Sequence, residues 1–241
     1  MTALEQLDII KRALYVTEDG KEFKIKLKAG LSDQQIDQLA AQLPAAQIPA
    51  DIRALLRFTS GFSFSGLDEI SFDGVGQFGF ENIFPHSVQL AGDGAGNFWI
   101  VDVNKKGEWG HVYFVCHDPA VVVKQSEDLV EFLEQLDELG RKPEQATLSR
   151  FLDLTTARIF NQEDGFMDME AAIRSDDRVL REFAAALPEN FVIADLRGKS
   201  IQTGFAWGKY GPQVERAIRH EEELLWGFEV MEGKKPWWRF W

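Results

Sequence analysis

The stretch from residue 93 to residue 119 constrains the fold of this chain more than any other. It opens with a glycine-rich turn, Asp93-Gly94-Ala95-Gly96-Asn97, and continues as two runs rich in aromatic and β-branched residues, 97–103 and 109–117. A polar connection, Asn104-Lys105-Lys106-Gly107-Glu108, joins the two runs. Such a pattern predicts a β-hairpin.

The side chains of this predicted hairpin divide between two faces, because successive residues of a strand point in opposite directions. On the first strand, alternation groups Asn97, Trp99 and Val101 on one face and Phe98, Ile100 and Asp102 on the other. On the second strand, one face carries Trp109, His111, Tyr113, Val115 and His117, and the other carries Val112, Phe114 and Cys116. Both faces hold large apolar groups, so we expect the hairpin in the middle of a sheet, with material packed on both sides.

The motif Asp93-Gly-x-Gly-Asn-x-Trp-x-x-Asp102, followed by an aromatic strand that ends in His117-Asp118-Pro119 and then by a helix, resembles the SUKH superfamily. That superfamily groups bacterial toxin-immunity proteins with a fungal regulator of cell-wall assembly. A second pattern, from Ile48 to Gly61, resembles the opening helix of the family, with Ser60-Gly61 in place of the usual Asn-Gly. The resemblance covers roughly 45–138 and does not reach the residues after it.

This resemblance implies an α+β fold with helices packed around a mostly antiparallel central sheet. It also implies a non-enzymatic module that binds a protein. The motif residues that it carries over are expected to define the fold first and to form contacts only second; they are Asp93, Gly94, Gly96, Asn97, Trp99 and Asp102.

Hydrophobic periodicity and capping residues outline the rest of the chain. We expect helices over 3–13, 32–43, 49–60 and 126–139, with Ser126 as the N-cap of the last one, an early hairpin over 15–27, and strands near 68–72, 78–83 and 87–91. The tail is expected to hold a helix around 148–159, one or two helices over 169–187 broken near Ser175, strands over 191–196 and 202–207, a helix over 212–220 and a final hairpin over 225–241. The segment Arg141-Lys142-Pro143 is a predicted linker. We therefore divide the chain into a SUKH-like domain with an N-terminal helix-hairpin, 1–142, and a C-terminal α+β extension, 143–241.

Charge is distributed unevenly along the chain. The formal net charge is -13, and residues 58–140 hold 3 Lys and Arg against 14 Asp and Glu. Such a field repels nucleic acids and anionic lipid surfaces and attracts basic partners. The alternative interpretation is solubility alone, because six of these acids are expected on the exposed face of the 126–139 helix: Glu127, Asp128, Glu131, Glu134, Asp137 and Glu138.

Patterns that carry chemistry are weak. The Gly-x-Gly-x-x-Gly over 74–79 lacks the long helix that a dinucleotide site needs after it. A Ca²⁺ loop around Asp93 would need more oxygen ligands in register. His111 and His117 lie six residues apart on one strand, and Cys116 faces away from both, so neither a shared metal nor a Cys-His pair is expected. We predict no catalytic residue, no metal site and no cofactor.

These observations favour a cytoplasmic protein that acts by contact. The only cysteine rules out an internal disulfide, no run of 18 apolar residues predicts a membrane span, and the N-terminus has no secretory pattern. The expected function is an immunity-type protein that neutralises a toxin domain, possibly a nuclease, through an acidic surface. The alternatives are a regulatory scaffold with several partners and, third, an unrecognised hydrolase. The identity of the partner and the oligomeric state are left open by the sequence.

Overall fold

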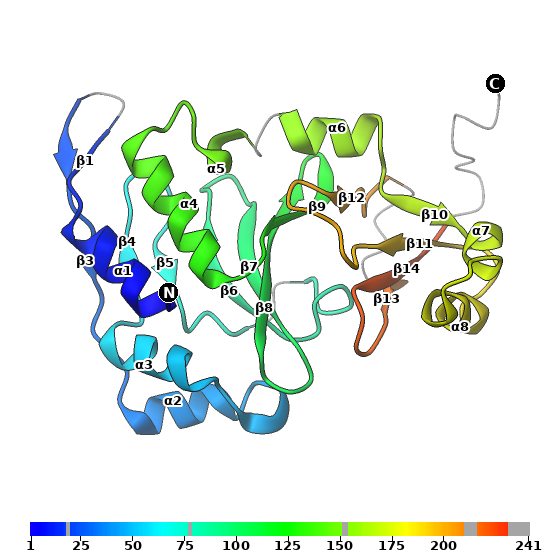
Figure 1. Cartoon of the computed structure of the whole chain (residues 1–241), viewed down its shortest axis with the longest axis horizontal. Helices are drawn as coiled ribbons and strands as arrows, with labels where there is room; N and C mark the ends of the chain where they lie inside the picture. Colours follow the sequence, from blue (N-terminus) through cyan, green and yellow to red (C-terminus); the bar gives the residue numbers. More distant parts are fainter. Residues whose placement is uncertain (18–19, 77–78, 151–153, 210–215, 231–241) are drawn as a thin grey trace.

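The computed structural model describes residues 1–17, 20–76, 79–150, 154–209 and 216–230. Its centre is an antiparallel five-stranded sheet in the order β12-β9-β8-β7-β6 (Figure 1). The strands are β6 (Ser87–Gly92), β7 (Phe98–Val103), β8 (Trp109–His117), β9 (Ala120–Ser126) and β12 (Gly204–Phe205). The β7–β8 pair is the predicted hairpin, and its central position in the sheet is confirmed.

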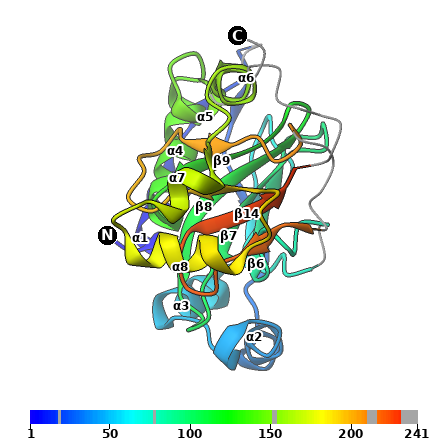
Figure 2. The same ribbon diagram turned by 90° about the vertical axis from the view of Figure 1, so that its right-hand side faces the viewer.

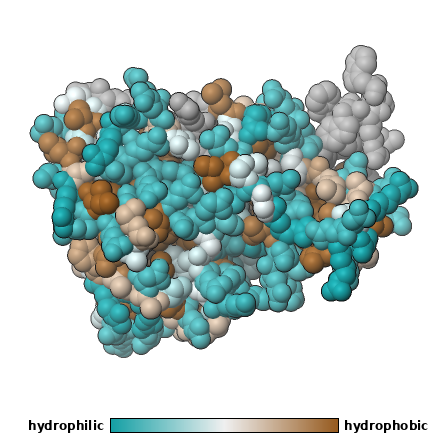
Figure 3. All heavy atoms as spheres, viewed as in Figure 1, coloured by the Kyte–Doolittle hydropathy of each residue, from teal (hydrophilic) through white to brown (hydrophobic). Residues whose placement is uncertain are grey.

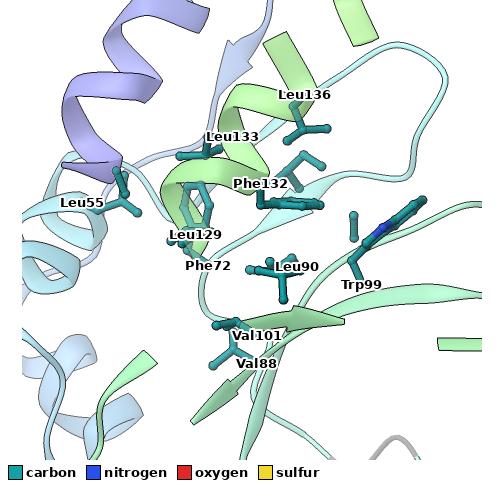
Figure 4. Close-up of a cluster of buried hydrophobic side chains, with 14 of the residues drawn as sticks. Leu55, Phe72, Val88, Leu90, Trp99, Val101, Leu129, Phe132, Leu133 and Leu136 are labelled. Atoms are coloured by element: carbon teal, nitrogen blue, oxygen red, sulfur yellow. The ribbon is translucent and has the colours of Figure 1, made fainter. Parts of the chain in front are cut away.

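Helices cover one face of this sheet, as the α+β prediction requires. α4 (Leu129–Arg141) lies against β8 and β9, α1 (Ala3–Arg12) packs on α4 and on α3 (Ala50–Phe58), and α2 (Asp33–Ala40) packs on α3. Capping boxes begin α1 at Thr2 and α2 at Ser32, as the sequence pattern of α2 predicts. Leu129, Phe132, Leu133 and Leu136 of α4 pack against Trp99 and the neighbouring strands (Figure 4). This cluster is the main core of the molecule.

Short elements complete the N-terminal part. A two-stranded sheet pairs β1 (Tyr15–Val16) with β2 (Glu22–Phe23), and a 3₁₀ helix spans Pro44–Ala46. A three-stranded sheet joins β3 (Lys26–Leu27), β4 (Gly61–Ser63) and β5 (Ile70–Ser71). These pieces position the 68–75 segment beside β6, which forms one edge of the central sheet.

The tail builds a second antiparallel sheet in the order β10-β11-β14-β13. The strands of this sheet are β10 (Phe166–Asp168), β11 (Phe191–Asp195), β13 (Ile218–Arg219) and β14 (Leu225–Glu229). The helices of the tail are α5 (Thr147–Arg150), α6 (Thr156–Asn161), α7 (Met169–Ile173) and α8 (Arg178–Ala186). Viewed from the tail side, β14 and α8 lie in front of the central strands (Figure 2). A second buried cluster, which includes Ile100, Tyr113, Trp226 and Phe228, fills the space between the two sheets.

The two faces of β7 agree with the predicted alternation, but one residue of β8 does not. Trp109 packs with the helix-covered cluster, on the opposite side from Tyr113. The register shifts between Val101 and Val103, so that one residue of β7 opposes two of β8. A β-bulge of this kind reverses the alternation of side chains on the strand that carries the extra residue.

Several other elements differ from the sequence-based expectation. Strand β9 is not predicted, and α4 begins after Asp128 instead of Ser126, because Ser126 is a buried residue of β9. No strand forms over 79–83, and residues 218–219, expected in a helix, are strand β13, which pairs with β14. The other residues of the predicted strand 78–83, helix 212–220 and final hairpin 225–241, at 78, 212–215 and 231–241, lie outside the described residues.

Candidate functional site

The glycine-rich turn of the motif is held together by the side chain of its first residue. The Asp93 Oδ1 accepts hydrogen bonds from the backbone N–H groups of Ala95 at 2.8 Å and of Asn97 at 3.0 Å. The Asn97 side-chain amide donates to Asp93 Oδ2 at 2.6 Å. Gly94 and Gly96 have φ angles of 76° and 91°, which L side chains rarely adopt. These four residues therefore build the connection between β6 and β7.

The same turn packs against the end of β8 through Asn97. Its Oδ1 accepts the backbone N–H of His117 at 3.0 Å and lies 2.8 Å from the Nδ1 of the same residue. A Cβ added at Gly96 would lie 3.2 Å from the His117 ring. The sequence interpretation of the His117-Asp118-Pro119 segment, a strand end with side-chain hydrogen bonds, agrees with this geometry.

Trp99 points into the helix-covered core and is 1% exposed. Its Nε1 donates to the Gln125 Oε1 at 3.0 Å. Gln125 Nε2 in turn donates to Gln135 Oε1 at 2.6 Å, and Gln135 Nε2 donates to the Gln125 carbonyl at 3.1 Å. This buried chain of amides links β7, β9 and α4, and it satisfies every polar group that the indole brings into the core.

Asp102 lies on the opposite face of β7 and binds the tail. Its two carboxylate oxygens accept hydrogen bonds from Arg219 Nη1 at 2.6 Å and Arg219 Nη2 at 2.5 Å. The guanidinium also lies over the rings of Trp226 and Phe84, at 5.2 Å and 5.8 Å from their centroids. Burial opposes the charge of Arg219, but the Asp102 carboxylate outweighs it and raises the pKa of the guanidinium.

The structure thus separates the predicted motif residues into three places. Asp93, Gly94, Gly96 and Asn97 form one turn, whereas Trp99 and Asp102 point to opposite faces of the sheet. Each polar side chain of the motif is occupied by bonds within the chain. Their fold-defining role has a physical basis, and their role as contact residues stays a prediction.

Beside the motif turn lies a groove of about 350 Å³ that the sequence did not indicate. It runs between β6 and the 68–75 segment, and its lining residues are Asp68, Glu69, Ser71, Gly74, Val75, Gln89, Leu90, Ala91 and Gly92. The exposed Asp68 carboxylate lies against the backbone of Gly92, where an added Cβ would collide with it. No local pattern marks Asp68, because its neighbours come from a strand far along the chain.

A second pocket of about 460 Å³ lies in the tail, between α6, β10 and the end of β11. Buried apolar residues, including Ile159, Ile193 and Leu196, contribute to its lining. The acids around it are each paired with a cation: Glu163 with Arg158, Asp164 with Lys209 and Asp195 with Arg197. This pairing leaves the pocket without a strong charge preference.

Groups that could perform chemistry are dispersed. Among the described residues, no three His, Cys, Asp or Glu side chains gather closely enough to hold a metal ion. Cys116 is a free, buried thiol whose pKa is raised by burial. His111 Nδ1 lies 2.8 Å from the Glu127 carbonyl oxygen, where it borders α4. In the part of the chain that the structure describes, no helix has the length and apolarity to cross a bilayer.

Most acids of the 127–138 region have partners inside the molecule. Glu127 pairs with the buried Lys124 at 2.7 Å, and Asp128 caps α4. Asp137 accepts the Tyr15 hydroxyl at 2.6 Å and binds Arg141, and Glu138 accepts two hydrogen bonds from Thr147. Polar residues cover most of the face that includes α4, and apolar residues appear on it in small groups (Figure 3). The solubility interpretation of this helix is therefore incomplete, because most of its acids stabilise the fold.

Comparison with known proteins gives one match. Residues 30–135 match the family model of the SMI1 / KNR4 family (SUKH-1). Neither the search of curated proteins nor the search of solved structures gave a match. The family match includes the motif turn, the hairpin, the groove and most of α4. It begins earlier than the motif-based resemblance and therefore also takes in α2.

Proposed function

Because residues 30–135 are a member of the SMI1/KNR4 family (SUKH-1), within the SUKH superfamily, we propose that this chain is a non-enzymatic protein-binding module of the immunity type. In this proposal it binds a toxin domain and blocks the activity of that domain. The family match is the observation that carries the proposal, since the superfamily includes immunity proteins. The proposed location is the cytoplasm, a reducing compartment in which the thiol of Cys116 stays free.

The charge distribution supports a basic partner. Residues 58–140 carry the acid excess, and Asp68 and Glu134 are exposed acids of that segment. A negative surface speeds the encounter with a basic protein and disfavours nucleic acid. Nuclease active sites bind phosphate and are basic, so a nuclease toxin is the kind of partner that this charge fits best.

The domain division at 142/143 also remains our proposal. It is supported by the end of the family match at residue 135 and by the separate sheet of the tail. The two parts are joined by more than the linker, because β12 pairs with β9 at Gly204↔Val123 and Phe205↔Val122. In this proposal the tail is an extension that completes the first part.

Co-expression tests the immunity proposal. A toxin encoded beside the gene for this chain is expressed with and without the chain, and survival of the cells is measured. We expect survival to rise by orders of magnitude with the chain and to be unchanged with an unrelated acidic protein of similar net charge. Killing that is the same with and without the chain would count against immunity.

A regulatory scaffold is the second candidate, and the tail favours it. Residues 143–241 lie outside the family match, yet they add a four-stranded sheet and a pocket of about 460 Å³. Affinity capture separates the two candidates. One tight partner that is released by salt supports immunity, and several weak partners support a scaffold.

A further inference from the structure

Three half-buried aromatic rings lie together at the end of the central sheet that carries the motif turn. Phe80 meets Trp207 nearly at a right angle, with ring centroids 5.0 Å apart, and meets Phe98 at 5.7 Å. These three residues, the ring cluster, pack on the rim of the second buried cluster and keep part of their surface exposed. Aromatic side chains are enriched at protein interfaces, where they supply a large contact area at a low cost in conformational entropy.

The indole of Trp207 is fixed against the turn between β8 and β9. Its Nε1 donates to the Cys116 carbonyl at 3.2 Å, and the next residue, Gly208, donates its N–H to the Ala120 carbonyl, also at 3.2 Å. Phe98 directly follows the motif turn, which is itself hydrogen-bonded to the end of β8. The ring cluster therefore lies where the tail meets both turns, and it is preorganised for a contact.

The same end of the sheet carries negative charge. Asp118 is exposed in the turn between β8 and β9, and its carboxylate makes no hydrogen bond or ion pair within the described part of the chain. Asp93 lies in the motif turn, which it holds together. Burial raises the pKa of the Cys116 thiol, and the charges of Asp93 and Asp118 add to that rise, which places both carboxylates near the end of β8. A cation that approaches the ring cluster is therefore attracted by two carboxylates.

The interior of the molecule shows what such a combination of groups binds. The Arg219 guanidinium lies over the rings of Trp226 and Phe84 while its N–H groups bind the Asp102 carboxylate, as described above. A guanidinium can do both at once because it is planar: it stacks on an aromatic face and presents its N–H groups at its edge. The ammonium of a lysine lacks this geometry.

From this correspondence we propose that the ring cluster and Asp118 form a surface that docks a protein partner through an arginine side chain. The guanidinium stacks on the ring of Trp207 or Phe80 and pairs with the Asp118 carboxylate. This assignment rests on the proposed function as a protein-binding module and names its docking surface and the chemistry of the anchor. Trp207 lies outside the family match, so the tail supplies part of this surface and takes part in the choice of partner.

The test uses the full-length chain and peptides of defined chemistry. A labelled, end-blocked heptapeptide of alternating Arg and Ser is titrated against the chain by fluorescence anisotropy, and NMR shifts of backbone amides and indole N–H groups locate it. In two comparison peptides, Lys or citrulline, a neutral analogue of arginine, replaces each Arg. We expect the Arg peptide to bind about threefold more tightly than the Lys peptide and the citrulline peptide not to bind. The shifts should be concentrated in 93–98, 116–120 and 205–208.

Two variants, each with a matched control, locate the anchor. Asp118→Asn removes the proposed carboxylate, and Glu134→Gln removes an exposed acid on α4. Trp207→Leu removes the indole, and Phe58→Leu removes an exposed ring on α3. We expect Asp118→Asn and Trp207→Leu each to weaken the Arg peptide about fivefold, as for the loss of about 1 kcal/mol, and each control to change it less than about twofold. Circular dichroism checks the folding of each variant, and Asp118→Asn, at an exposed position, decides the question if Trp207→Leu does not fold.

Equal weakening by Asp118→Asn and Glu134→Gln, equal binding of the Arg and Lys peptides, or shifts spread over the acidic surface would overturn the docking surface. The co-expression assay keeps this inference separate from the proposed function. If the wild-type chain protects cells and both Asp118→Asn and Trp207→Leu protect them equally well, the docking surface fails while the immunity proposal stands. If the wild-type chain gives no protection, the immunity proposal fails, and the peptide titration alone decides whether the ring cluster binds arginine.

Discussion

The two faces of the central sheet are covered in physically different ways. The face toward α4 is packed with aliphatic and aromatic side chains, and a hydrogen-bonded polar network runs through it from Trp99 to Gln125 and Gln135. The face toward the tail is rich in aromatic rings and contains the ion pair of Asp102 with Arg219. Each face also buries one polar group without a partner among the described residues, the Trp109 Nε1 on the helix side and the Tyr113 hydroxyl on the tail side.

This difference shows how the helices and the second sheet are each positioned on the central sheet. Helices are placed on a sheet by the shape of their apolar side chains, and small errors are corrected by repacking. On the tail side, a buried ion pair favours one position of the second sheet at a cost in desolvation. We therefore infer that the tail is held in place by the pairing of β12 with β9 together with the ion pair of Asp102 and Arg219, whereas the helix side is held mainly by packing.

The largest effect is expected on the helix side. Trp99→Ala removes a fully buried indole and leaves the Gln125 oxygen without its donor, so it should lower the free energy of unfolding by about 3–5 kcal/mol. Trp99→Phe, which keeps most of the ring volume, should cost clearly less. Chemical denaturation measures both variants. A free energy of unfolding for Trp99→Ala close to that of the wild type would contradict the burial of the indole and make Trp99 an interface candidate.

On the tail side, breaking the ion pair should cost almost as much. Arg219→Met leaves the Asp102 carboxylate buried without a partner, which typically destabilises a protein by about 3–5 kcal/mol. The double variant Asp102→Leu, Arg219→Met should recover most of that loss, because no unpaired charge remains. Arg57→Met, which breaks the exposed pair with Asp33, should cost less than about 1 kcal/mol. No recovery in the double variant would mean that the pair contributes more than charge compensation.

A smaller effect is expected in the motif turn, which belongs to neither face. Asp93→Ala removes the acceptor of three hydrogen bonds and should cost about 1–2 kcal/mol, as for the loss of a helix cap. Amide exchange of Ala95 and Asn97 should accelerate before that of β7 and β8. Unchanged exchange at these two amides would show that the glycines alone hold the turn.

The smallest expected effects are those of replacing two buried tyrosines, and they should change the stability in opposite directions. Tyr113→Phe removes a buried hydroxyl that has no partner in the described structure, so stability should be unchanged or rise by up to about 1 kcal/mol. Tyr15→Phe loses the hydrogen bond to Asp137 and should cost about 0.5–1.5 kcal/mol. Burial raises the pKa of both hydroxyls, so the folded state favours the neutral form of each tyrosine and gains stability from it. This contribution is present below the ordinary tyrosine pKa of about 10 and is lost at higher pH. Stability measured at pH 7 and pH 11 should therefore differ less in either variant than in the wild type.

Local patterns predicted much of this fold. The helices with clear periodicity and caps, α1 to α4, and the break between α7 and α8 near Ser175 follow from the sequence, as does the central hairpin. Strand β9 was missed because Ser126 reads equally well as the start of a helix, and Asp128 two residues later is just as good a cap. Burial of Ser126 decides between them, and burial is a tertiary property.

The candidate site was less predictable for the same reason. The turn chemistry of Asp93 and the burial of Trp99 follow from residue type. The pairing of Asp102 with Arg219 joins residues 117 positions apart. The place of Asp68 in the groove depends on its position beside β6, which the local sequence does not show. The bulge that moves Trp109 to the other face likewise depends on the pairing of two strands.

The late position of β12 in the chain has a consequence for biosynthesis. Four strands of the central sheet have been synthesised once the ribosome reaches residue 126, but the fifth strand, β12, is residues 204–205. At ~5–20 residues per second, translation takes roughly 4–15 s to supply it. During that interval the nascent chain presents the free backbone of β9 and a ring-lined surface to its surroundings. Because β12 is synthesised so late, we expect chaperones to bind the nascent chain at that stage and misassembly to increase when translation of the tail is slowed.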